Sequence, residues 1–241
     1  MNRGIYATGT GILVAQKLLD ITANNIANVN TNGYKSDSVA FNDMFQQQLG
    51  FNKEYFDGIG TLGIGPQFTG QFADRTLGSM QQTSNPLDAA IATENGMFTV
   101  NTPGGTRYTR DGAFNLAPDR TLVTNQGYAV LDKNGSPITV PSGQLSIATN
   151  GDLSVDGGKP FATLGIADGT FTKEGENLWT APDATVEANP SIRQAMLESS
   201  NVNPMSAMID MIKISRSVEM AQKSIQSQDD STQKLLGSLN N

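Results

Sequence analysis

The sequence predicts an α+β protein in which long N- and C-terminal helices, paired as in a coiled coil, accompany a central all-β domain of short antiparallel strands. Two observations carry this prediction. Apolar residues recur every seven positions at both ends of the chain, and turn signals recur about every eight to twelve residues in the middle. With 241 residues, 37% of them hydrophobic, the chain can build a modest core.

The N-terminal segment, residues 1–33, is predicted to be an amphipathic helix. Two interleaved rows with seven-residue spacing predict a stripe like the a and d positions of a coiled coil. An ordinary helix packed on a globular core is the alternative interpretation. The first row consists of Ile5, Ile12, Leu19 and Ile26, and the second of Thr8, Ala15, Thr22 and Val29.

The C-terminal segment, residues 191–241, is predicted to contain a long helix from about residue 205. After Pro204 there is no helix breaker until Gly237, so about 33 residues could extend for roughly 50 Å. Both seams are partly polar, so we expect each helix to be marginal alone and to need neighbouring copies. One row holds Met211, Val218, Ile225, Thr232 and Leu239, and the other Met208, Ser215, Gln222, Asp229 and Leu236.

Five asparagines and one glycine crowd the stretch ANNIANVNTNGYK, residues 23–35. We expect the amides of Asn24, Asn25 and Asn28 to bridge to adjacent helices and fix their register, as a buried asparagine does in coiled coils. Asn30, Asn32 and Gly33 are predicted to end the helix, because these residue types tolerate the left-handed conformation of a C-cap. An exposed cap without a role in assembly is the alternative. These predictions mark Ile5, Ile12, Leu19, Asn24, Asn25, Ile26, Asn28, Val29, Met208, Met211, Val218, Ile225 and Leu239 as assembly residues.

The middle of the chain reads as β structure. Residues 96–140 alternate strand-like runs with Pro-Gly-Gly, Asp-Gly, Pro-Asp, Asn-Gln-Gly and Asn-Gly turns, which predict hairpins. We place the globular domain at 67–190. Residues 34–66 are predicted to be a connecting arm whose aromatic residues pack against a partner or against the chain's own long helix.

Composition excludes several classes of function. A net charge of −7 without a Lys/Arg cluster argues against nucleic-acid binding. The sequence has no histidine or cysteine, which removes imidazole chemistry, thiol nucleophiles, disulfides and nearly all zinc sites. We expect no membrane span and no cleavable signal peptide, since the apolar run near the N-terminus covers only residues 12–15.

Catalysis and metal binding would depend on aspartates in turns. Asp-Gly and Pro-Asp are ordinary turn chemistry, so we predict no enzyme. The stretch NGDLSVDGG, residues 150–158, lacks the regular order of a calcium loop, so no metal or cofactor is expected. Methionines 205, 208 and 211 fit adaptable packing against several neighbours better than a cofactor box. The aspartates considered are Asp111, Asp119, Asp132, Asp152 and Asp156.

Four stretches resemble one known family. ITANNIANVNTNGYK (21–35) strongly resembles the N-terminal signature of the bacterial flagellar rod and hook protein family. NPLDAAI (85–91), RYTRDGAFNL (107–116) and LVTNQGYAVLD (122–132) resemble its β-domain motifs, and SSNVNPMSAMIDMIKISRSVEM (199–220) resembles its C-terminal motif. These motifs cover both ends and the middle of the chain in the family's order.

The resemblance implies a structural subunit of the flagellar basal-body rod. In that family the terminal segments pair as an inner helical layer, the D0 region, with the β domain (D1) outside it. The resemblance also implies other rod subunits and ring proteins as partners, a place in the periplasm, and export through the flagellar type III apparatus without signal cleavage. FNDMF, with Phe41 and Phe45, is similar to an element presented to the export gate, although simple packing of the arm is an equal alternative.

Three identities remain open. The short arm and the stretch GSPITVPSGQLSIATNGDLS (135–154) favour a proximal rod protein, whereas LGIGPQF (62–68) resembles the distal type. A β-domain binding or adhesin module with a helical stalk is the rival from a different class. Protease-sensitive ends around a resistant middle would favour the rod subunit over that rival.

Overall fold

The computed structural model describes residues 2–45, 63–187 and 190–239, and the fold is α+β. The chain divides into two compact units. The terminal unit comprises Met1–Ile26, Asp37–Phe72 and Asn203–Asn241, and the β-rich unit comprises Ala27–Ser36 and Ala73–Val202. Both ends of the chain therefore belong to one unit, and the middle forms the other.

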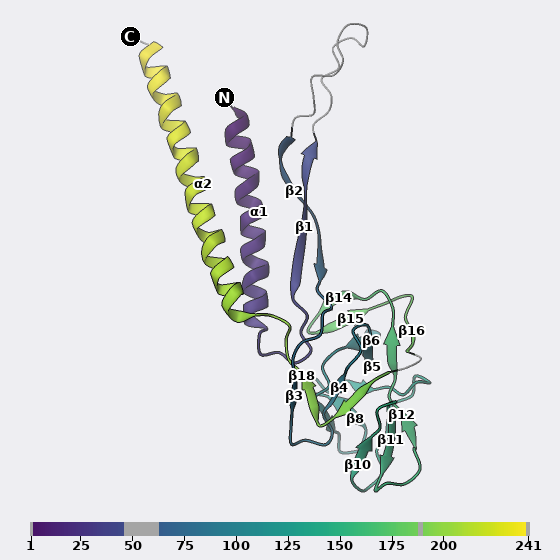
Figure 1. The fold of residues 1–241 in the computed structure, drawn as a ribbon. Helices are drawn as coiled ribbons and strands as arrows, with labels where there is room; N and C mark the ends of the chain where they lie inside the picture. Colours follow the sequence, from purple (N-terminus) through teal and green to yellow (C-terminus); the bar gives the residue numbers. More distant parts are fainter. Residues whose placement is uncertain (1, 46–62, 188–189, 240–241) are drawn as a thin grey trace, which may run out of the picture. The chain divides into compact units, whose positions relative to one another are not determined.

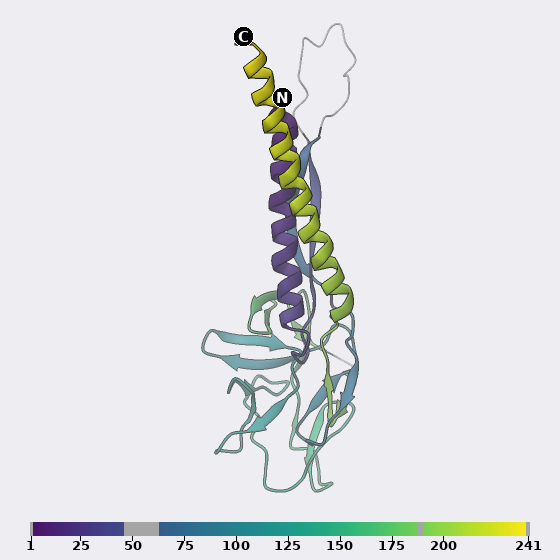
Figure 2. The same cartoon turned by 90° about the vertical axis from the view of Figure 1, so that its left-hand side faces the viewer.

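The terminal unit contains two long helices and a two-stranded sheet. Helix α1 (Asn2–Ala27) and helix α2 (Pro204–Leu239) run in opposite directions, with both chain ends at the same end of the pair (Figures 1 and 2). Strand β1 (Asp37–Phe45) pairs with β2 (Gly63–Ala73). The segment predicted to be an arm, 34–66, thus contains all of β1 and the start of β2, while 46–62 lie outside the described residues.

Helix α2 begins at a conventional N-cap. The Asn203 carboxamide oxygen accepts hydrogen bonds from the backbone amides of Met205 (3.1 Å) and Ser206 (3.2 Å). Pro204 occupies the first helical position, where its missing N–H costs nothing and its fixed φ suits the helix. Helix α2 thus begins one residue before the predicted start near residue 205.

The end of α1 requires a correction. The sequence predicts Asn32 and Gly33 as the helix end, but α1 ends at Ala27 and two turns follow, with hydrogen bonds from Thr31 N to Asn28 O and from Tyr34 N to Thr31 O. Gly33 does have the left-handed φ of +64°, but for another reason. A Cβ there would lie 2.5 Å from the backbone of Arg110, so Gly33 permits a close approach to the β-rich unit's own backbone.

The β-rich unit is built around an antiparallel sheet with the strand order β14-β15-β6-β5-β9-β8-β7, with β13 joining β5 to β16. A three-stranded sheet, β10-β11-β12, and the two-stranded pairs β17-β4 and β18-β3 complete it (Figure 1). The strands are β3 (Met80–Gln82), β4 (Ala89–Ile91), β5 (Met97–Thr102), β6 (Gly105–Thr109), β7 (Phe114–Leu116), β8 (Leu122–Thr124), β9 (Ala129–Val130), β10 (Leu145–Ile147), β11 (Asp152–Val155), β12 (Ala162–Thr163), β13 (Ile166–Asp168), β14 (Thr172–Gly175), β15 (Leu178–Thr180), β16 (Thr185–Val186), β17 (Ile192–Gln194) and β18 (Met196–Glu198).

Most of the predicted hairpins are present. β5 and β6 pair across Pro103-Gly104, β7 and β8 across Pro118-Asp119, and β8 and β9 across Asn125-Gln126-Gly127. Asp111-Gly112 is different, because it joins β6 to β7, which are not neighbours. A Cβ on Gly112 would fall 1.6 Å from the Ala89 carbonyl oxygen, so that glycine also serves a close backbone approach.

Two apolar clusters hold the β-rich unit together. The larger one is centred on Phe98 and Phe114, whose rings meet edge to face with centroids 5.0 Å apart. The smaller one surrounds Trp179 and includes Met97, Ala167 and Phe171. Strands β8 and β10 alternate buried with less buried residues, as in a sheet that buries one face, whereas β4 is buried along its whole length.

Candidate assembly surfaces and a buried charged junction

Helix α2 has a half-buried row with a regular spacing. Its members recur at alternate steps of four and three residues, the repeat of a coiled-coil seam. Met211, Val218, Ile225 and Thr232 are the members of one predicted row. The companions are Ala207, Ile214, Ala221 and Gln228, whereas the companions expected from the sequence at 208, 215, 222 and 229 are exposed.

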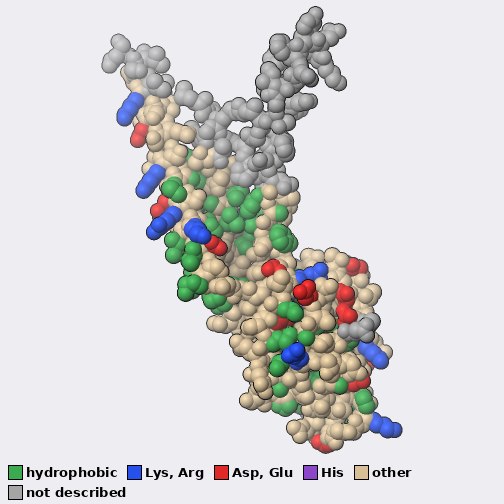
Figure 3. Space-filling model, viewed as in Figure 1, with side chains coloured by type: hydrophobic (Ala, Val, Ile, Leu, Met, Phe, Trp, Pro, Cys, Tyr) green, Lys and Arg blue, Asp and Glu red, His purple; other side chains and the backbone are tan. Residues whose placement is uncertain are grey.

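The opposite side of α2 is also apolar, and it is exposed. At 3.6 residues per turn this side lies roughly half a turn of the helix away from the half-buried row. Met205 and Met220 are 68% and 65% exposed, and Figure 3 shows hydrophobic side chains along the part of α2 nearer its start. The exposed apolar face of α2 consists of Met205, Met208, Ile209, Ile212 and Met220.

Helix α1 is covered on most of its circumference. Of the predicted assembly residues in α1, Ile12, Leu19 and Ile26 are half-buried. Among the side chains of α1 that the structure describes, residues 8–27, the most buried is Ile21, outside the predicted rows. One face is exposed and carries Leu13. Val29, beyond the helix end, is half-buried as well. The side chains of Ile5 and Leu239 lie outside the described residues.

Asn25 and Asn28, two of the asparagines predicted to bridge between helices, form hydrogen bonds within the chain. The Asn25 carboxamide donates to the carbonyl oxygen of Asp37 (2.9 Å) and accepts from its amide (2.8 Å), so it pairs with the first residue of β1 as a neighbouring strand would. Asn28 accepts from the Thr31 hydroxyl (3.2 Å). Asn24 is exposed. The interpretation of these amides as bridges between helices of adjacent copies therefore stays a prediction.

The proposed export element lies on β1. The ring of Phe41 is half-buried and meets the ring of Phe68 on β2 edge to face, with centroids 6.4 Å apart. Phe68 in turn lies 5.8 Å from the Lys17 ammonium of α1. The alternative of simple packing therefore has a structural counterpart for Phe41, while the side chain of Phe45 lies outside the described residues.

A buried group of three charges lies in the β-rich unit. The Glu198 carboxylate, 1% exposed, accepts from the Lys35 ammonium through one oxygen and from the Arg110 guanidinium through the other, both at 2.6 Å. Arg110 also donates to the carbonyl oxygens of Ile91 (3.0 Å) and Gly96. We call Lys35, Arg110 and Glu198 the charged junction.

The electrostatics of the junction follow from its composition of two cations and one anion. Burial alone would raise the pKa of the Glu198 carboxyl. The charge of Arg110, with the charge and hydrogen bond of Lys35, outweighs this effect, so the pKa lies below its usual value. Burial lowers the pKa of Lys35 because it removes water from the ammonium, and the hydrogen bond and charge of Glu198 offset this effect only in part. The junction therefore favours an ionised Glu198.

The junction is extended by hydrogen bonds among three chain segments. The Asn201 carboxamide accepts from the Ser36 amide (2.8 Å) and donates to the Asp74 carbonyl oxygen (2.9 Å). The backbone amide of Gly33 donates to the Glu198 carbonyl oxygen (2.7 Å). The Lys173 ammonium lies 4.0 Å above the Tyr34 ring and donates to the Lys35 carbonyl oxygen (3.1 Å).

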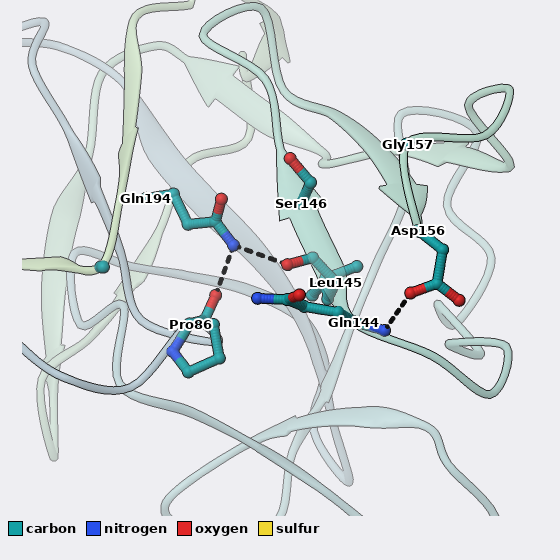
Figure 4. Close-up of a pocket in the computed structure, with 8 residues that line it drawn as sticks. Pro86, Gln144, Leu145, Ser146, Asp156, Gly157 and Gln194 are labelled. Atoms are coloured by element: carbon teal, nitrogen blue, oxygen red, sulfur yellow. Dashed lines mark hydrogen bonds between the residues drawn. The ribbon is translucent and has the colours of Figure 1, made fainter.

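A shallow hollow of about 470 Å³ lies elsewhere on the β-rich unit (Figure 4). Its polar groups serve the fold. Gln194 donates to the carbonyl oxygens of Pro86 (2.7 Å) and Leu145 (2.9 Å), and Asp156 accepts from the Gln144 amide (2.9 Å). This lining offers one carboxylate and no second group paired with it, so it is not the two-carboxylate arrangement considered for Asp156.

Two features are absent from the part of the chain that the structure describes. Within residues 2–45, 63–187 and 190–239, no cluster of three or more acidic side chains could hold a metal ion. Within the same ranges, neither helix has the length and apolar character needed to cross a membrane.

Comparison with known proteins identifies three matching family models. "Flagella basal body rod protein" matches residues 6–35, "Flagellar hook protein FlgE/F/G D1 domain" matches 91–155, and "Flagellar basal body rod FlgEFG protein C-terminal" matches 193–238. They fall on the two ends and the middle of the chain.

Full-length relatives agree with these matches. The flagellar basal-body rod protein FlgF of Caulobacter vibrioides is 34% identical over 236 residues, covering 92% of each chain. The chain belongs to the flagellar basal-body rod protein family. FlgF of Rhizobium meliloti is 33% identical over 228 residues, covering 91% of this chain and 90% of the relative. FlgG of Bacillus subtilis is 32% identical over 262 aligned residues, covering 98% of each chain.

The charged junction draws one residue from each part of the rod-protein match. Lys35 is the last residue of the first matched range, Arg110 lies in the second and Glu198 in the third. The sequence does not predict this cluster, because each charge, taken alone, fits a solvated surface. The sequence did offer one indication of the cluster. Lys35 and Arg110 lie inside two of the motifs that resemble the rod family, and Glu198 directly precedes a third.

Proposed function

We propose that this chain polymerises helically in the rod of the flagellar basal body and transmits torque from the motor toward the hook. Helices α1 and α2 would form the inner D0 layer by coiled-coil-like pairing, and the β-rich unit would brace the outside. Membership of the rod-protein family and the four-and-three spacing of the half-buried row on α2 support this proposal.

The exposed apolar face of α2 is the observation that carries the proposal. Large side chains such as Met205, Ile212 and Met220 meet water in the single chain, although the other side of the same helix already holds the half-buried row. Contiguous exposed apolar surface marks an interaction site. Identical helices arranged around a common axis would bury both sides of α2 at once.

We favour the proximal position in the rod over the distal one. The stretch 135–154 supports the proximal type, and 62–68 supports the distal alternative. Identities of 34% and 32% to the FlgF and FlgG relatives differ too little to discriminate. Neighbouring rod proteins, the surrounding rings and the type III export apparatus are the proposed partners, with the subunit reaching the periplasm uncleaved. A map of an intact basal body in which this chain occupies the distal segment would contradict the proximal assignment.

A paired substitution tests the assembly role. Replacing Ile12 and Ile225 together with aspartate puts two charges on half-buried positions of α1 and α2, which the polymer has to bury. We expect motility to be lost while the β-rich unit keeps its thermal transition. Gln16→Asp with Gln226→Asp, at exposed positions of the same helices, is the matched control and should swim. Swimming by the Ile12/Ile225 variant would sink the proposal.

A further inference from the structure

The chain itself can carry mechanical load between the two units at four crossings. The chain passes from one unit to the other after Ile26, Ser36, Phe72 and Val202. Three of these crossings lie next to segments that the charged junction and Asn201 hold together, namely 33–36, 73–78 and 198–202. If the chain is a rod subunit as proposed, these segments are where torque enters and leaves the β-rich unit.

Each pair of these segments is connected by short hydrogen bonds. Segments 33–36 and 198–202 are joined from Lys35 to Glu198 (2.6 Å) and from the Ser36 amide to Asn201 (2.8 Å). Segments 73–78 and 198–202 are joined from the Gly78 amide to the Glu198 carboxylate (2.9 Å). Segments 33–36 and 73–78 are joined from Lys35 to the Thr76 carbonyl oxygen (2.7 Å).

The connection continues into the folded body of the β-rich unit through Arg110. Its guanidinium is buried, binds Glu198, and donates to the carbonyl oxygens of Ile91, the last residue of β4, and Gly96, in the loop that leads to β5. Gly33 packs directly on the Arg110 backbone, where even a methyl group would collide. The crossing segments are thereby attached to the loop and strands that flank the core.

The charged hydrogen bonds of this connection should resist mechanical load, although they need not raise the free energy of unfolding. A buried ion pair often contributes no more to stability than an apolar cluster of the same size, because its desolvation cost is high. Apolar contacts are non-directional and can slide. Charge-assisted hydrogen bonds are short and directional, so a small displacement of any one segment breaks them. A junction of this kind resists shear among the segments that it joins.

We propose that Glu198 and Asn201 are positioning residues for torque transmission, clamping the segments at three crossings into one rigid attachment point on the β-rich unit. The proposal rests on the proposed rod function and adds to it the place where the load is transferred. The clamp acts through Lys35, Arg110 and the backbone of the crossing segments.

Hydrogen exchange on the purified full-length chain tests the clamp itself. In Glu198→Gln the Gly78 amide faces a neutral carboxamide in place of its carboxylate acceptor, and in Asn201→Ala the Ser36 amide loses its side-chain acceptor. Each amide should exchange about tenfold faster or more than in the wild type. The amide of Leu131, bonded to the Thr99 carbonyl oxygen, should keep its rate. Glu174→Gln, which removes an exposed ion pair with Arg107 in the same unit, is the matched control.

Rotation under load tests the role in torque. Cells that carry Glu198→Gln or Asn201→Ala in place of the wild-type gene should build hooks but lose rotation speed more steeply than wild type as medium viscosity rises, whereas Glu174→Gln should follow the wild-type curve. Should Glu198→Gln fail to fold, Asn201→Ala decides alone, because it removes no buried charge.

Two results would overturn the clamp: unchanged exchange at Gly78 and Ser36, or faster exchange with a wild-type load curve. The proposed function fails separately, if deletion of the gene leaves basal bodies and swimming intact. Complementation of the deletion by the wild-type gene therefore precedes the comparison of variants.

Discussion

Glu198 shows how much of this protein's geometry one side chain can define. Its two carboxylate oxygens bind a lysine 163 residues away and an arginine 88 residues away, and its backbone oxygen binds Gly33. A buried carboxylate is tolerated only where such partners replace its hydration. Loss of the carboxylate leaves two cations buried without an anion, whereas loss of an exposed partner leaves a charge in water.

Glu198→Gln should lower the free energy of unfolding of the β-rich unit by about 3–5 kcal/mol, the usual cost of removing one partner from a buried ion pair. Chemical denaturation of the full-length chain, followed by the fluorescence of Trp179, measures it. Glu174→Gln removes an exposed partner and should leave the denaturation midpoint unchanged. If both variants had the same denaturation midpoint, the charges of the junction would have to be screened by water in solution.

The same residue predicts a pH dependence. Because the pKa of Glu198 is lower in the folded chain than in the unfolded one, its stabilising contribution is complete above the unfolded pKa of about 4.3 and is lost as the pH falls through the folded value. The difference in unfolding free energy between wild type and Glu198→Gln should therefore be constant from pH 7 down to about 5 and shrink below that. A difference that stays constant down to pH 3 would contradict the direction of this shift.

Asp111 should act in the opposite direction. Burial raises the pKa of its carboxyl, and the nearby Asp88 adds to the effect, so its contribution to stability is present at low pH and lost as the pH rises through the folded pKa. The difference in unfolding free energy between wild type and Asp111→Asn should therefore fall as the pH rises through the folded pKa of Asp111, opposite to the trend for Glu198→Gln. Chemical denaturation of both variants across the same pH range checks the two signs.

Gly33→Ala should destabilise the β-rich unit more than a glycine substitution elsewhere with a similar φ. A left-handed alanine costs about 1–2 kcal/mol, and the collision with the Arg110 backbone adds about 1–3 kcal/mol. Gly157→Ala is the control, because Gly157 has a φ of +70° and no atom within 4 Å of an added Cβ. If both variants lose the same stability, the close approach of Gly33 to Arg110 is not maintained in solution.

At the scale of elements, a seven-residue spacing allows two alternative seams on helix α2, and the structure shows which of them is half-buried. The row through Met211, Val218 and Ile225 can be completed on either side of the helix by companions four and three residues away. The sequence predicts 208, 215, 222 and 229, but the structure half-buries 207, 214, 221 and 228. The observed companions include Ile214 and Ala221, so this choice buries more apolar surface than Ser215 and Gln222 would.

Adjacent substitutions test which seam is used in the polymer. Ile214→Asp places a charge in the half-buried row and should prevent incorporation into basal bodies, whereas Ser215→Asp lies outside the row and should incorporate at close to the wild-type level. Immunoblotting of purified basal bodies measures both variants. Incorporation of Ile214→Asp together with exclusion of Ser215→Asp would favour the seam predicted from the sequence.

For the whole molecule, the division into two units predicts how a free subunit behaves. The β-rich unit has two buried apolar clusters, whereas α2 keeps large apolar side chains exposed and has partly polar seams. Regions with few buried contacts open at low free-energy cost. The unpolymerised chain should therefore combine a stable middle with ends that are easily opened.

Limited proteolysis of the unpolymerised chain should remove the terminal segments first and leave a resistant fragment of about residues 73–202. Mass spectrometry of the fragments identifies the boundaries, and circular dichroism should show helix content rising when the chain polymerises. A free chain that resists cleavage throughout, and melts in one transition, would instead fit the binding module with a finished helical stalk.

The sequence by itself determined the α+β class, the start of α2 at Pro204, most hairpin turns and the family. These are local properties: seven-residue periodicity, Asn-Pro caps and Gly-containing turns act through neighbours within a few residues. Only the tertiary structure decided the end of α1 at Ala27, the companion row on α2 and the charged junction. The physical reason is that Lys35, Arg110 and Glu198 meet across 88 to 163 residues, and no local pattern specifies which buried charges become partners.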